Sequence, residues 1–197
     1  PLKIEFYYYR GSEKFPLEIK NKEEKFCFHL RSKPLFFRLD PDYECPVKKV
    51  KLEVSRSLLY EQLKRDKDPI GRIEAAQSLV AKVSQADIKV LSQGLKKETQ
   101  WGVANRIAKA LGKIGGESAR DGLLKVVNSR EAKIRRGIVQ ALGEFIGDEK
   151  VTRILKKIAG GDPSYRVEAE ALSSLGRIKA KNCRPFLEGF LDRPSHN

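Results

Sequence analysis

The stretch WGVANRIAKALGKIG, residues 101–115, decides the fold of this chain. Its apolar residues recur three and four positions apart, at Val103, Ile107, Ala108, Leu111 and Ile114. This spacing places them along one stripe of an α-helix. Gly115 follows directly, and glycine is the residue that most often ends a helix. The stretch therefore predicts an amphipathic helix that buries one face and ends at Gly115.

The same pattern recurs along the chain with a period of 31 to 33 residues. Leu111 has counterparts at Leu79, Leu142 and Leu175, and shorter amphipathic segments lie between them. A single pair of helices cannot bury its apolar stripe, whereas stacked pairs bury a continuous one. Residues 55–197 are therefore predicted to form an armadillo-like α-solenoid of four to four and a half helix pairs. The expected fold class is mostly α.

Residues 1–54 follow a different rule, because apolar and polar residues alternate with a period of two. Turn residues such as Gly11-Ser12 interrupt the alternation, which is typical of half-buried antiparallel strands. Five strands are expected, near residues 2–9, 17–19, 26–31, 35–39 and 49–54. We predict a small antiparallel β-sandwich segment here, truncated at its N-terminal end.

Charge is abundant and unevenly distributed. The 197 residues carry a formal net charge of +14, of which +3 falls in residues 1–54 and +11 in residues 55–197. A basic helical array can attract nucleic acid or an acidic protein surface. A solvated surface with no such role is the plainer interpretation.

Composition bears on location and completeness. Three cysteines cannot all pair, which favours a reducing compartment, and we expect a cytoplasmic protein. The sequence has no apolar run of transmembrane length, and no membrane partner is expected. It contains no methionine and opens within strand-like sequence, so we expect it to be part of a longer protein.

Residue types that carry catalysis or bind metal ions are sparse. The two histidines are His29 and His196, and Cys27 stands two residues from His29 without any cluster of metal-ligand spacing. Glycine-rich phosphate-binding motifs are absent from the sequence. We predict no catalytic, cofactor-binding or metal-binding residue in this chain.

The runs 101–115 and 134–145 resemble HEAT-like repeats of the short-period type. That resemblance implies the fold and says almost nothing about function.

A second resemblance spans both regions. Its motifs occur in order at Lys33-Pro34-Leu35, Phe37-Arg38-Leu39-Asp40-Pro41, Gln62-Leu63, Asp66, Asp68, Gly71-Arg72-Ile73-Glu74-Ala75-Ala76, Gln100-Trp101-Gly102-Val103, Gly161-Asp162-Pro163-Ser164-Tyr165 and Val167-Glu168-Ala169. This set resembles the C-terminal part of microbial zinc aminopeptidases of the aminopeptidase N family. The resemblance implies a β-sandwich that leads into a helical repeat domain, which walls off the active-site chamber. The family's H-E-x-x-H and G-x-M-E-N motifs do not occur here, so zinc is expected only in a catalytic domain outside this chain.

The leading hypothesis is a non-catalytic scaffold and gating region of an aminopeptidase N-like zinc metallopeptidase. It would act through contacts with the catalytic domain of the same parent protein, or with another protein. The residues expected to make these contacts are Arg72, Trp101, Arg106, Lys109, Arg135, Arg136 and Arg166.

Two alternatives remain open. One is a free-standing basic HEAT-like module that binds nucleic acid or an acidic protein partner. The basic row on residues 106–113 is not continued in the other repeats, where Glu74, Gly137 and Glu170 stand in place of Arg106. The other alternative is a catalytically dead aminopeptidase-like scaffold.

Overall fold

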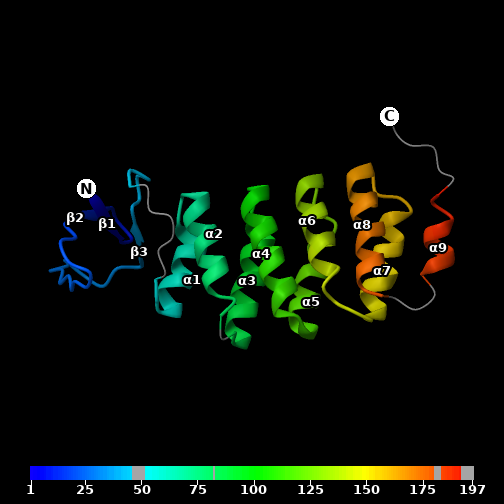
Figure 1. The fold of residues 1–197 in the computed structure, drawn as a ribbon, viewed down its shortest axis with the longest axis horizontal. Helices are drawn as coiled ribbons and strands as arrows, with labels where there is room; N and C mark the ends of the chain where they lie inside the picture. The colour runs from blue at the N-terminus through cyan, green and yellow to red at the C-terminus, as the bar shows by residue number, and fades with distance from the viewer. Residues whose placement is uncertain (46–51, 82, 180–182, 192–197) are drawn as a thin grey trace. The chain divides into compact units, whose positions relative to one another are not determined.

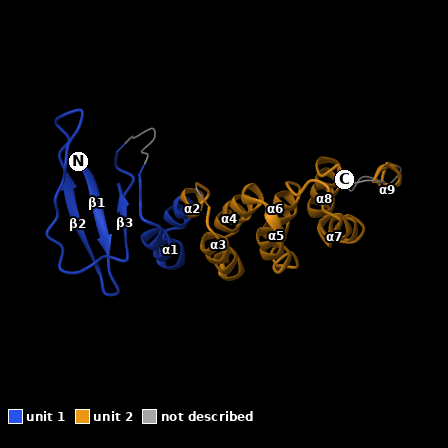
Figure 2. Ribbon diagram, turned by 90° about the horizontal axis from the view of Figure 1, so that it is seen from below, with its two compact units in different colours: residues 1–75 blue, residues 76–197 orange. Residues whose placement is uncertain are grey.

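A computed structural model describes residues 1–45, 52–81, 83–179 and 183–191. These residues form three strands and nine helices: β1 (Leu2–Tyr7), β2 (Ser12–Leu17), β3 (Phe36–Leu39), α1 (Arg56–Arg65), α2 (Pro69–Ser78), α3 (Gln85–Lys97), α4 (Trp101–Ile114), α5 (Gly116–Leu124), α6 (Ala132–Leu142), α7 (Glu149–Ala159), α8 (Tyr165–Arg177) and α9 (Arg184–Glu188). The predicted fold class, a mostly α solenoid preceded by a small antiparallel β-sandwich segment, is confirmed as a helical array that follows a three-stranded antiparallel sheet (Figure 1). The chain divides into two compact units, residues 1–75 and 76–197 (Figure 2).

The sheet lies in the first unit. Its strand order is β2-β1-β3 and both pairings are antiparallel, so that Ile4 of the central strand lies opposite Phe15 on one side and Leu39 on the other. Alternate residues of β1 point to opposite faces. Phe6 on one face packs edge-on against Phe28 at a centroid distance of 5.1 Å. Tyr7 on the other face stacks on Phe36 at 4.6 Å.

One predicted strand is wrong and another is displaced, since the strand expected near residues 17–19 is β2, which ends at Leu17. Residues 26–31 alternate as a strand would, yet they form no strand in the structure. Phe28 instead packs on the rings of Phe6 and Phe15, so aromatic packing rather than strand pairing accounts for its apolar character. The strand expected at 49–54 falls partly outside the described residues, and residues 52–54 are not in a strand.

The second unit consists of two rows of helices. Figure 2 shows α4, α6 and α8 side by side in one row and α3, α5 and α7 in the other. The predicted apolar stripe forms the core between the rows, and Leu111, Leu142 and Leu175 are almost completely buried. Burial of a leucine side chain stabilises a fold by about 1.5–3 kcal/mol, so these repeated positions account for much of its stability.

Close approach within the α4–α6–α8 row depends on small residues. A Cβ atom added to Gly112 would lie 2.9 Å from the carbonyl oxygen of Ala141. The backbones of α4 and α6 therefore meet at a distance that only glycine allows. Gly115, which ends α4 with a φ of +69°, confirms the helix end predicted from the sequence.

The division at Ala75 groups α1 and most of α2 with the strands. The sequence predicts a boundary between residues 54 and 55, where the secondary structure changes. Compactness and secondary structure are different criteria, so that boundary remains a prediction.

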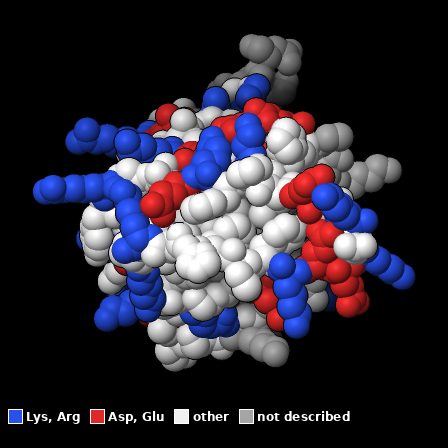
Figure 3. All heavy atoms as spheres, turned by 90° about the vertical axis from the view of Figure 1, so that its left-hand side faces the viewer, with Lys and Arg blue, Asp and Glu red and all other residues white. Residues whose placement is uncertain are grey.

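On the side of the strands, Figure 3 shows a broad uncharged area bordered by both acidic and basic side chains. That face carries no field of a single sign.

Candidate interaction surface

A groove crosses the α4–α6–α8 row near the N-terminal ends of these helices. It has a volume of about 390 Å³ and is lined by Trp101, Asn105, Ala132, Lys133, Arg136, Gly137, Gln140, Ser164 and Arg166. We call this set the Trp101 groove. Each helix contributes because equivalent positions of successive repeats lie side by side in a stacked array.

Trp101 opens α4 and is the only tryptophan in the chain. Its side chain is not part of the core, since 48% of the residue is exposed. The Lys133 Nζ atom lies 5.1 Å from the centre of its ring, within the range of a cation–π interaction. The groove therefore presents an aromatic surface with a positive charge held over it.

Asn105 lies one helical turn after Trp101 and on the same face of α4. Its side chain fits against Gly137 of α6, where an added Cβ atom would lie 1.9 Å from the Asn105 Oδ1 atom. That oxygen is buried and has no hydrogen-bond partner within the described part of the chain. Buried polar atoms rarely remain unpaired, so Asn105 carries an unsatisfied acceptor in the wall of the groove.

Two arginines supply further positive charge at the groove. Arg136 on α6 has a side chain that is 55% exposed and forms an ion pair of 3.3 Å with Glu170 of α8. Arg166 on α8 is exposed, and its Nε atom donates a hydrogen bond to the hydroxyl of Tyr165. Both guanidinium groups belong to the same surface as Lys133.

The structure thus brings together three of the contact residues predicted from the sequence, Trp101, Arg136 and Arg166. Arg106 and Lys109 are exposed on α4 but do not line the groove. Asn105 and Gln140 also line the groove and were not predicted from the sequence. The four-residue spacing from Trp101 to Asn105 was the available signal, because it puts both on one helix face.

Arg135 and Arg72 occupy equivalent repeat positions, and each donates hydrogen bonds to two backbone carbonyl oxygens before its own helix. The Arg135 NH1 atom donates to the carbonyl oxygens of Ser129 and Arg130, and the Arg72 NH1 atom donates to those of Asp66 and Lys67. These bonds fasten the turn that precedes each helix. Both arginines therefore have a structural use within their own repeats.

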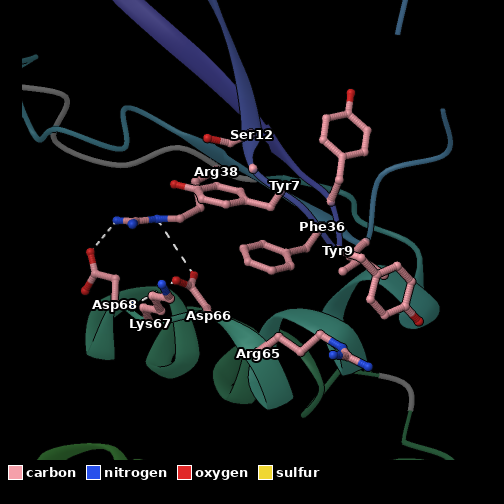
Figure 4. Close-up of a pocket in the computed structure, with 12 residues that line it drawn as sticks. Tyr7, Tyr9, Ser12, Phe36, Arg38, Arg65, Asp66, Lys67 and Asp68 are labelled. Carbon is pink, nitrogen blue, oxygen red and sulfur yellow. Dashed lines mark hydrogen bonds and ion pairs between the residues drawn. The ribbon is translucent and has the colours of Figure 1, made fainter. Parts of the chain in front are cut away.

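A second cavity, of about 480 Å³, lies in the first unit. Figure 4 shows Tyr7 and Phe36 stacked at its wall, with Arg38 reaching from β3 toward Asp66 and Asp68 beyond the end of α1. The Arg38 side chain is 9% exposed, and its Nε atom lies 3.8 Å from Asp66 Oδ2. Its NH2 atom lies 2.5 Å from Asp68 Oδ2.

Two carboxylates face the Arg38 guanidinium in this second cavity. Burial raises the pKa of Asp66. Burial also opposes ionisation of Asp68, but hydrogen bonds from Tyr43 and the Ile70 backbone, together with Arg38, outweigh it and lower the pKa of that carboxyl. Gly71 leaves room for Asp66, because a Cβ atom there would lie 1.9 Å from its Oδ2 atom. Arg38, Asp66 and Asp68 therefore join β3 to the α1–α2 turn.

Across the described ranges, no group of three or more His, Cys, Asp or Glu side chains could hold a metal ion. His29 and Cys27 are both exposed, and His196 lies outside the described residues. None of the described helices combines the length and apolar character needed to span a membrane.

The fold and the groove place this chain in the class of helical-repeat proteins. A family model for HEAT repeats matches residues 56–136 and 120–197, and the chain belongs to that family. A comparison with curated proteins found no match.

Solved structures of the same fold exist, and 19 of their chains match this one. One is the complex of CpcE and CpcF of phycocyanin lyase from Nostoc sp. PCC7120, with a TM-score of 0.59 and 22% sequence identity. The match covers 78% of this chain and 64% of that chain, so it spans less than two thirds of that protein's length. At this identity the likeness concerns the fold alone.

Proposed function

We propose that this chain is a non-catalytic HEAT-repeat scaffold that binds a protein partner through the Trp101 groove. The observation that carries the proposal is the half-exposed Trp101, over which Lys133 holds a positive charge. Tryptophan and arginine are the residues most enriched among those that dominate the binding energy of protein interfaces. Two arginines and the only tryptophan of the chain line this one groove.

The CpcE–CpcF structure supports a protein partner, because that HEAT-type fold was solved as a complex of two proteins. For this chain we propose the catalytic domain of a zinc aminopeptidase of the aminopeptidase N family, in the same polypeptide or as a separate chain. The ordered motifs from Lys33-Pro34-Leu35 to Val167-Glu168-Ala169 support that choice. Several of them, including Arg38, Asp66 and Asp68, form the buried cluster of the first unit, which accords with a scaffold.

Cross-linking the chain to a purified aminopeptidase N-type catalytic domain from the same source tests this proposal. We expect cross-links from Lys133 and a measurable affinity that Trp101→Ala lowers by about tenfold or more, as for an interface hot spot. Lys89→Ala on α3 is the control, because this exposed lysine lies in the other row. Equal affinity for Trp101→Ala and the unaltered chain would overturn the groove as the interface.

The net charge of +14 favours nucleic acid as a second candidate ligand. Binding of duplex DNA would then fall steeply as salt concentration rises, because each phosphate contact releases counterions.

In a catalytically dead scaffold, the partner domain would keep its shape but lack the zinc ligands. Reading the coding sequence of the partner domain for H-E-x-x-H distinguishes this case.

A further inference from the structure

We infer that the Trp101 groove recognises an extended peptide segment rich in acidic side chains. The inference rests on the proposed function and adds the chemistry of the partner. The groove offers three kinds of group: a carboxamide for the peptide backbone, cations for the peptide's carboxylates, and an aromatic ring for apolar contact. All three come from residues that line one groove.

Asn105 supplies the backbone contact. A carboxamide offers both an acceptor and donors, the same pair of functions that an extended peptide group presents in reverse. The Asn105 Oδ1 atom is buried without a hydrogen-bond partner in the part of the chain that the structure describes. It lies against Gly137, so the carboxamide has to turn toward the groove before a backbone N–H of a bound peptide can donate to it. An extended segment exposes such N–H groups, whereas a helix uses its own internally.

Lys133, Arg136 and Arg166 supply the charge. The ion pairs found among the described residues give Arg136 a partner in Glu170 and give none to Lys133 or Arg166. A ligand with carboxylates would supply the missing countercharge. Trp101 lies beneath Lys133, so it offers its ring to an apolar side chain or to the peptide plane next to a carboxylate.

The same geometry disfavours a nucleic acid duplex. A phosphate backbone needs cations spread over successive repeats. On α8 the positions equivalent to Arg106 and Lys109 are Glu170 and Ser173. Glu170 therefore interrupts the row of cations that a duplex would need, and it forms ion pairs with Arg136 and Arg177. A short acidic segment fits this distribution better than a duplex does.

Fluorescence anisotropy with three labelled probes tests the inference: a short peptide that alternates glutamate with alanine, a lysine–alanine peptide of the same length, and duplex DNA. We expect the glutamate peptide to bind and the lysine peptide not to bind. Lys133→Glu should weaken binding about fivefold or more, and Asn105→Leu about tenfold through loss of the backbone hydrogen bonds. Asn105→Leu keeps the side-chain size, and circular dichroism checks that it folds.

Matched controls lie in the other helix row, on α3. Lys89→Glu makes the same charge reversal and Gln93→Ala removes an exposed carboxamide, and neither should change the affinity. Equal binding of both peptides, or tighter binding of DNA than of the glutamate peptide, overturns the inference. If the glutamate peptide fails while cross-links to the catalytic domain still depend on Trp101, the inference fails and the proposed function stands. If both are lost, both fail.

Discussion

Arg135 of α6 donates two parallel hydrogen bonds to Asp162, which lies in the turn before α8. The Nε atom lies 2.8 Å from Oδ2 and the NH2 atom 2.8 Å from Oδ1. Both side chains are largely shielded from water, with 13% and 7% of their surfaces exposed. A planar guanidinium matches a carboxylate in this way, whereas a lysine ammonium cannot. The pair links two successive repeats of the same helix row.

Replacing Arg135 with alanine should lower the free energy of unfolding by about 2 kcal/mol, because it leaves Asp162 shielded and unpaired. Urea denaturation followed by circular dichroism measures the change. Arg153→Ala, on the exposed face of α7, should stay within about 0.5 kcal/mol of the unaltered chain. Similar losses in both variants would mean that the paired geometry adds nothing.

Acid should weaken the same link. Burial opposes ionisation of Asp162, but hydrogen bonds from Arg135 and Ser164 outweigh it, so the pKa of this carboxyl lies below its ordinary value of 3.8. The folded state therefore binds fewer protons than the unfolded state. The stabilisation that ionised Asp162 gives to the folded state is complete at neutral pH and is lost as the pH falls below about 4. Urea titrations over a pH series measure the free energy of unfolding. Below about pH 4 it should fall less steeply for Asp162→Asn than for Glu149→Gln.

Two glycines at one repeat position should respond to alanine with opposite signs. Gly112 meets the backbone of Ala141, whereas Gly176 has no atom within 4 Å of an added Cβ. Gly112→Ala should destabilise the chain by about 1–3 kcal/mol through overpacking. Gly176→Ala should stabilise it by up to about 1 kcal/mol through helix propensity. Thermal unfolding of both variants measures the difference, and equal shifts would contradict the close approach of α4 and α6.

The ion pairs of Arg38 with Asp66 and Asp68 should be needed for the first unit to fold. Arg38→Met keeps the length of the side chain but leaves Asp66 and Asp68 without their shared cation. We expect a loss of about 3 kcal/mol, the cost typical of breaking a buried ion pair. Arg10→Met changes an exposed arginine of the same unit and serves as control. Hydrogen exchange of the sheet amides would report the loss locally, and unchanged protection would contradict it.

Trp101 can report the charge around it. Because it is the only tryptophan, all tryptophan emission of the chain comes from the groove. Iodide should quench this emission more strongly than caesium, since Lys133 attracts the anion to the ring. Lys133→Glu should reverse that order, whereas Lys89→Glu should preserve it. Stern–Volmer slopes at low salt measure the effect, and equal slopes for both ions would argue against a positive groove.

The sequence by itself determined the repeat, the helix ends and the core positions. These depend on local rules: apolar residues at helical spacing form a stripe, and glycine ends a helix. Leu111 and Gly115 behave as those rules require. The strand expected at 26–31 failed because alternation does not distinguish a paired strand from a segment whose phenylalanine packs on neighbouring rings.

Only the tertiary structure decided the use of each polar side chain. Arg135 and Arg136 are neighbours in sequence, yet one grips Asp162 and the other lines the groove. Nothing local separates them, because the partner of Arg135 lies 27 residues further along the chain. The importance of Asn105 likewise depends on Gly137, one repeat away. Stacking of the repeats brings these residues together, so the groove exists only once the helices have packed.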